Sequence, residues 1–164
     1  MRLDEHLSYR VANAIKALLA NRSGLTVDWV RDEHPPGTTD PNWICKFADD
    51  GGHAFLSGDF QILQHWPDLI AYIESGLISF FPPSGFDRSK GYGQAALIIR
   101  WWPAIIEKAK VSQRGDCWRI PMAWTPDVTK FEKLEDPRFK TKDQQVASGI
   151  RPLATVHQFR NPGR

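Results

Sequence analysis

Acidic residues in the first half of the chain occupy positions from which they could share a cation. They are Asp4 and Glu5 after a short apolar segment, Asp40 before a helical pattern, and Asp59 after an apolar run. Carboxylates forced close together repel one another, and a divalent cation relieves that repulsion. Oxygen ligands without His or Cys favour Mg²⁺ or Mn²⁺ over zinc. Such an ion activates water and neutralises charge on a phosphate under attack.

Each acidic residue also has a structural interpretation. Asp40 precedes a proline, the usual start of a helix, so its carboxylate is expected to serve as the N-cap if it has no other role. Asp59 fits a turn residue, whereas a carboxylate at Asp4, at the end of a buried strand, has no structural explanation. The pair Asp32-Glu33 falls in a polar loop and is expected to be solvated.

Apolar periodicity predicts alternating strands and helices. We expect strands at 1–3, 25–30, 53–57 and 77–81, helices at 8–19, 40–50, 67–75 and 94–110, and an edge strand at 117–122. Pro103 should kink or split the last helix. This alternation is typical of an α/β fold with a parallel sheet covered on both faces, in which ligands bind beyond the C-terminal ends of the strands.

Charge is distributed unevenly along a chain whose length suits one domain. Residues 1–80 contain 6 Lys and Arg against 11 Asp and Glu, whereas residues 81–164 contain 15 against 8. An acidic centre beside a basic surface suits a polyanionic partner, although solvated charges alone would give the same split. Beyond residue 124 the apolar residues lose their period, so we expect a packed domain at 1–124 and an extended C-terminal tail at 125–164.

Several classes of protein are excluded. No apolar run approaches the roughly 20 residues that span a bilayer, and the N-terminus lacks a secretory signal, so we expect a cytoplasmic protein without a membrane partner. Cys45 and Cys117 stand far apart and indicate free thiols rather than a disulfide or a zinc site. Gly91-Tyr92-Gly93 is too short for a phosphate loop, and neither a Walker nor a Gly-x-Ser-x-Gly motif occurs.

The acidic motifs resemble those of the PIN-like nuclease superfamily. Leu3-Asp4-Glu5 looks like the first-strand motif of the family, and Thr39-Asp40 before a helix is similar to its second acidic position. Ser57-Gly58-Asp59 resembles the Thr/Ser-x-Asp signature that follows the third strand. The run Arg100-Trp101-Trp102-Pro103 is associated with one subgroup. The resemblance covers about residues 1–122.

The resemblance implies a three-layer α/β/α Rossmann-like PIN fold with a short, mainly parallel sheet. It also implies a Mg²⁺- or Mn²⁺-dependent endoribonuclease of the toxin type, with RNA as substrate and an antitoxin as partner. By position, Asp4, Asp40 and Asp59 become metal ligands, and Glu5 an assisting catalytic residue. Many relatives have a further aspartate shortly after the third-strand signature, where this chain has Phe60-Gln61. This departure favours the alternative of a catalytically inactive module that binds RNA or an antitoxin. A metal-dependent DNA nuclease is a third alternative.

Basic and aromatic residues around the long helix suggest contacts with partners. Arg88, Lys90 and Arg100 would hold the RNA backbone if they lie on the rim of the acidic site. Trp101-Trp102 is interpreted as core or as a homodimer interface, with base stacking as the alternative. His6, beside the first acidic pair, either contacts a phosphate or transfers protons, or else faces solvent at the start of a helix.

Overall fold

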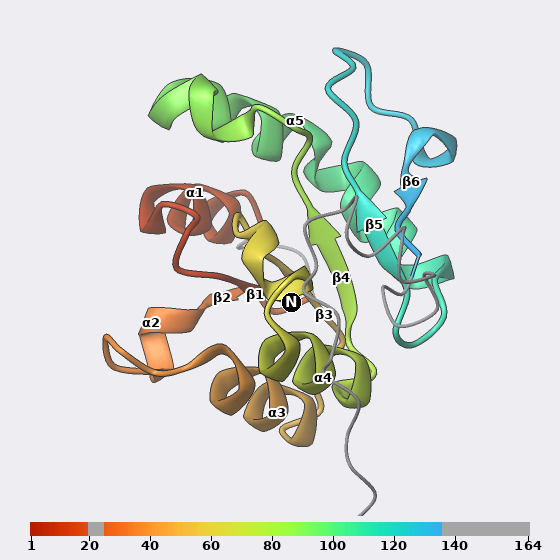
Figure 1. The fold of residues 1–164 in the computed structure, drawn as a ribbon. Helices are drawn as coiled ribbons and strands as arrows, with labels where there is room; N and C mark the ends of the chain where they lie inside the picture. The colour runs from red at the N-terminus through yellow and green to blue at the C-terminus, as the bar shows by residue number, and fades with distance from the viewer. Residues whose placement is uncertain (20–24, 136–164) are drawn as a thin grey trace, which may run out of the picture.

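A six-stranded sheet forms the centre of the computed structural model, which describes residues 1–19 and 25–135 (Figure 1). The strands lie in the order β2-β1-β3-β4-β5-β6. They are β1 (Arg2–Leu3), β2 (Asp28–Trp29), β3 (Ala54–Leu56), β4 (Ile78–Phe81), β5 (Cys117–Arg119) and β6 (Glu132–Lys133). All neighbours pair in parallel except β5 and β6. The predicted short, mainly parallel sheet is confirmed.

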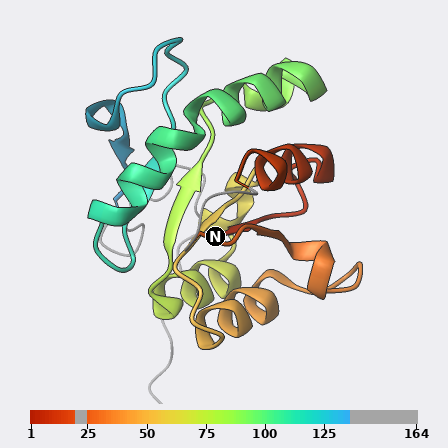
Figure 2. The same ribbon diagram turned by 180° about the vertical axis from the view of Figure 1, so that it is seen from behind.

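Helices cover both faces of this sheet. They are α1 (Tyr9–Leu19), α2 (Val30–Glu33), α3 (Asp40–Asp49), α4 (Trp66–Ser75) and α5 (Lys90–Val111), with 3-10 turns η1 (Phe60–Leu63), η2 (Phe86–Ser89) and η3 (Val128–Lys130). Figures 1 and 2 show α1 and α5 on one face and α3 and α4 on the other, which confirms the three-layer α/β/α arrangement. None of the described helices has the length and apolar character needed to cross a membrane.

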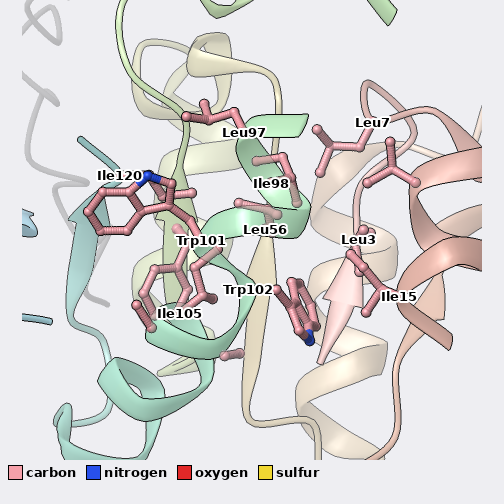
Figure 3. Packing of buried hydrophobic residues seen from close by; sticks show 14 of the residues in the cluster. Leu3, Leu7, Ile15, Leu56, Leu97, Ile98, Trp101, Trp102, Ile105 and Ile120 are labelled. Atoms are coloured by element: carbon pink, nitrogen blue, oxygen red, sulfur yellow. The ribbon is translucent and has the colours of Figure 1, made fainter. Parts of the chain in front are cut away.

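Two hydrophobic clusters, one on each face, hold the layers together because successive strand residues point to opposite sides. In β3, Leu56 packs into the cluster under α1 and α5, and Phe55 packs into the cluster under α3 and α4. Figure 3 shows the first cluster, where Trp101 and Trp102 of α5 lie among aliphatic side chains from the sheet and α1. Trp101 is 0% exposed and Trp102 is 4% exposed, so both belong to the core and the base-stacking alternative is wrong for them.

The segment around α2 differs from the prediction. The expected strand at 25–30 is confined to Asp28–Trp29, and a helix begins at Val30 where a loop was expected. The carboxylate of Asp32 accepts a hydrogen bond from the backbone N–H of Trp29 at 2.9 Å and pairs with Lys16. An acidic side chain that reaches back over the first turn stabilises a helix start. Asp32 has this role and is also exposed, as predicted.

The long helix α5 begins at Lys90, earlier than predicted, and continues for 22 residues through Pro103. The predicted split at Pro103 is therefore wrong. Pro103 is exposed, whereas Trp102 and Ala104 on either side of it are buried in the core. Tertiary packing of the apolar face stabilises a helix more than local propensity does, and here it outweighs the backbone hydrogen bond that proline removes.

The sheet extends further along the chain than expected. The predicted edge strand is internal, because β6 pairs on the outer side of β5. Phe131, just before β6, is buried, with its ring centroid 5.8 Å from that of Phe80 and 5.4 Å from that of Trp101. The first part of the segment expected as a tail therefore packs onto the domain, and the rest, 136–164, lies outside the described residues.

Candidate metal centre

Parallel strands β1 and β3 lie side by side and end at the same edge of the sheet. Leu3 pairs with Leu56, and the backbone N–H of Asp4 donates to the carbonyl of Leu56 at 2.9 Å. Asp4 and Ser57 are the next residues of the two strands, so their side chains emerge together. Ligands of parallel α/β sheets bind beyond this edge.

Asp4 is fully buried and its two carboxylate oxygens are both hydrogen-bonded. Oδ2 accepts from Ser57 Oγ at 2.6 Å, and Oδ1 accepts from the backbone N–H of Glu5 at 2.5 Å. Ser57 Oγ also accepts from the backbone N–H of Asp59 at 3.0 Å. The buried serine therefore connects the first and third acidic segments. The sequence pattern included Ser57 in a motif but gave it no positioning role.

His6 lies between two of the predicted site residues. Its Nδ1 is 3.1 Å from Asp4 Oδ2, and its Nε2 is 3.7 Å from Asp59 Oδ2. Gly58 allows this approach, because a Cβ there would lie 3.1 Å from the carbonyl oxygen of His6. The hydrogen bond to Asp4 raises the pKa of His6 against the opposing effect of burial, and the negative charges of Asp59 and Asp40 add to the rise. The half-exposed ring therefore belongs to the acidic group.

Asp40 is the first residue of α3, not its N-cap, which is Thr39. Asp40 Oδ1 accepts a hydrogen bond from Trp43 Nε1 at 2.8 Å. Burial raises the pKa of Asp40, the Trp43 hydrogen bond opposes this, and the charges of Asp4, Asp68 and Asp59 raise the pKa further. The capping interpretation is wrong. Asp40 instead lies within the electrostatic reach of the other predicted ligands.

Asp68 is a member of this acidic group that the sequence reasoning missed. It lies in the first turn of α4 and is bonded to His65, with Nδ1 and Oδ2 2.7 Å apart. Its side chain is largely buried, at 18% exposed. The sequence analysis considered strand ends and therefore missed Asp68. The first turn of a helix that follows a parallel strand lies at the same sheet edge as the end of that strand. The aspartate one residue after a helix-starting proline was the available signal.

The remaining predicted residues lie around the group. Glu5 forms an ion pair with Arg31 of α2, so its charge is compensated locally. Arg88 and Lys90 are exposed on the segment that follows β4, which ends at the same sheet edge. The Arg100 guanidinium lies 3.2 Å from the centroid of the Trp124 ring, stacked on that exposed side chain.

The four aspartates differ in their partners from five of the seven other acidic residues of the first half. Lysine or arginine pairs with Asp28, Glu33, Asp32, Glu5 and Asp50. Over the described ranges, Asp4, Asp59 and Asp68 form ion pairs with histidine alone, and Asp40 forms none. The negative charge at this edge is therefore not balanced by permanent cations of the described chain.

The donor chemistry of this group fits a hard divalent cation, since every aspartate offers oxygen ligands. In residues 1–19 and 25–135, no three His, Cys, Asp or Glu side chains stand in an arrangement that could hold a metal ion. The ring of His6 separates Asp4 from Asp59. These two residues can share one ion only after the half-exposed ring turns outward.

Comparison with known protein families gives a match over the first half of the chain. A family model described as a PIN like domain matches residues 1–84, more than half of the chain. The matched segment runs from β1 through β4 and includes all four aspartates, but not Arg88, Lys90 or α5. No curated protein and no solved structure matched the chain.

Proposed function

Because the chain belongs to the PIN like domain family, whose superfamily includes nucleases, we propose that it is a Mg²⁺- or Mn²⁺-dependent endoribonuclease. One observation supports this most strongly: no described lysine or arginine pairs with Asp4, Asp40, Asp59 or Asp68. Burial, together with the negative charges of the other three aspartates, raises the pKa of Asp40. A group of carboxylates that destabilise one another is the environment that a divalent cation stabilises. The toxin role and the antitoxin remain predictions from the resemblance, and a homodimer remains a prediction from the aromatic residues of the long helix.

In this proposal Asp4, Asp40 and Asp59 hold the ion, with Asp68 beside them. The ion supplies an activated water and neutralises charge on the phosphate. Ser57 and the backbone N–H of Glu5 fix the orientation of the Asp4 carboxylate, so the rearrangement that an ion requires is confined to the ring of His6. Arg88 and Lys90, on the exposed segment after β4, bind phosphates on either side of the scissile bond.

Thermal unfolding with and without Mn²⁺ tests the site. A ligand present at 100 times its Kd stabilises the native state by about 2.7 kcal/mol, which corresponds to a rise in Tm of about 5 to 10 °C for a chain of this size. We expect this rise for the wild type and its loss in Asp59→Asn, because the variant lacks one anionic ligand. Asp50→Asn serves as the control, since Asp50 lies at the far end of α3 from Asp40. An equal rise in all three proteins would refute the site.

His6→Ala should strengthen metal binding. The imidazole occupies the position between Asp4 and Asp59, so it competes with a cation for their oxygens. A hydrogen bond to a charged group contributes about 1.5 kcal/mol. Because this bond no longer competes with the ion, the Mn²⁺ concentration for half-maximal stabilisation should fall about tenfold. His53→Ala is the matched control, because His53 precedes β3 and lies at the opposite sheet edge. A weaker Mn²⁺ response in His6→Ala would instead make His6 a ligand.

The position of His6 also favours a second candidate function, a catalytically inactive module that binds RNA or an antitoxin. In that case the ring fills the site permanently, and the chain recognises a partner without cutting it. The Mn²⁺ titration separates the two functions. A Tm that responds to single-stranded RNA but not to Mn²⁺ would support the inactive module.

A further inference from the structure

A groove of about 250 Å³ runs between α1 and the N-terminal half of α5. Figures 1 and 2 both show these two helices side by side. Its lining includes Ser8 just before α1, Arg10 and Val11 of α1, and Tyr92, Ala95 and Ile99 of α5. The groove therefore has an apolar floor, with polar groups and one aromatic ring at its rim.

The groove opens near the acidic group. Helix α1 follows β1 and Asp4, and α5 follows β4, so both helices begin at the C-terminal edge of the sheet. Ser8, which lines the groove, comes shortly after His6 in the chain. The end of the groove at Ser8 therefore lies on the side of the domain where the aspartates emerge.

The lining chemistry differs sharply from that of the acidic group. None of the residues that line the groove is acidic, and Arg10 adds a positive charge. Tyr92 is 97% exposed, the most exposed large hydrophobic side chain of the described residues. An aromatic ring that gains nothing from burial in the domain is available to stack on a base, and arginine is available to a phosphate.

The size of the groove limits what can occupy it. Pockets for drug-sized ligands measure about 300–1,000 Å³, so a space of about 250 Å³ suits one planar ring and not the helix of a protein partner. The residue before the groove, Lys90, has φ 46°, an uncommon conformation for a residue other than glycine. It turns the chain into Gly91-Tyr92, and it places an exposed cation directly before these two lining residues.

We propose that this groove is a nucleobase subsite for single-stranded RNA. Tyr92 stacks on an unpaired base next to the scissile phosphate, and Arg10 and Lys90 contact the neighbouring phosphates. The bases of a duplex are stacked on one another and cannot enter, so the subsite selects single strands. This inference rests on the proposed function, because it names the substrate class of the same site.

Binding of an unstructured oligoribonucleotide carrying one 2-aminopurine tests the subsite without cleavage. With Ca²⁺ in place of Mn²⁺, we expect the fluorescence to fall as the base stacks. Tyr92→Ala should abolish this quenching and weaken binding about 10- to 100-fold, as the loss of one stacked base does. Tyr92→Phe should retain both the quenching and the affinity of the wild type. Val111→Ala, which removes exposed apolar surface at the opposite end of α5, should behave as wild type.

The outcomes separate this inference from the proposed nuclease. Unchanged binding by Tyr92→Ala, equal binding of a duplex, or no binding by the wild type would overturn the subsite even if the protein cuts RNA. A change in oligomeric state of Tyr92→Ala in sedimentation would also overturn it, since the groove would then be an interface between copies. Stacking that depends on Tyr92 without any Mn²⁺-dependent cleavage would leave the subsite standing and refute the nuclease.

Discussion

Asp4→Asn is expected to lower Mn²⁺-dependent RNA cleavage by more than about a hundredfold. Loss of an outer partner of a metal ligand already costs about 10- to 100-fold, and this change removes a charged ligand itself. Asparagine has the shape of aspartate, and its amide can still bond to Ser57 and to the backbone N–H of Glu5. The fold should therefore survive. Initial rates on a fluorescent single-stranded RNA, measured over a range of Mn²⁺ concentrations, check the expectation.

Two comparisons make this result specific to the acidic group. Asp50→Asn removes the same charge from an exposed residue paired with Lys46, and its cleavage rate should equal that of the wild type. A single-stranded DNA of matched sequence tests the DNA-nuclease alternative. Full activity in Asp4→Asn would remove the metal-ligand role of this residue, and activity on DNA alone would change the substrate class.

Arg2→Met is expected to destabilise the fold by about 3 kcal/mol. The guanidinium is 2% exposed, donates to Asp28 Oδ2 at 2.7 Å and to Glu33 Oε2 at 2.5 Å, and lies over the Phe47 ring. Removing one member of a buried pair leaves the partner charge uncompensated, at a cost of about 3–5 kcal/mol. The lower end of this range of energies applies because the side chain of Glu33 is half-exposed. Methionine preserves most of the apolar contact, so the loss reports on the charge.

Urea unfolding monitored by tryptophan fluorescence measures this difference from the midpoints and slopes. Lys46→Met is the control, because Lys46 forms an exposed pair with Asp50 and its loss should cost at most about 0.5 kcal/mol. The double variant Arg2→Met/Asp28→Asn should recover part of the lost stability, since it removes the uncompensated carboxylate. A loss for Arg2→Met no larger than that for Lys46→Met would mean that water replaces the guanidinium at little cost.

The Arg2 network also clarifies why charge alone did not identify the site. Arginine neutralises three of the five acidic residues among the first 33 positions: Arg2 pairs with Asp28 and Glu33, and Arg31 pairs with Glu5. These pairs hold β2 and α2 against β1. The acidic excess that remains for chemistry is the group around Asp40, which the described lysines and arginines do not pair with.

Local patterns of residues are enough to predict the alternation of elements and the sheet edge at which Asp4 and Asp59 emerge. Both follow from local rules: apolar runs form buried strands, and a polar residue directly after such a run is placed at the strand end. The two faces of the sheet were likewise predictable, because Phe55 and Leu56 must point in opposite directions. The family match over residues 1–84 agrees with this part of the reasoning.

Tertiary structure alone decided which polar groups meet. Asp68 joins Asp40 through the packing of α4 beside α3, and Arg31 reaches Glu5 through the position of α2. The continuity of α5 through Pro103 and the pairing of β6 with β5 also depend on contacts distant in sequence. Periodicity reports which face of an element is apolar, but not which neighbour covers it. The direction of His6 toward two carboxylates is the clearest case, because only the close approach of Gly58 brings them together.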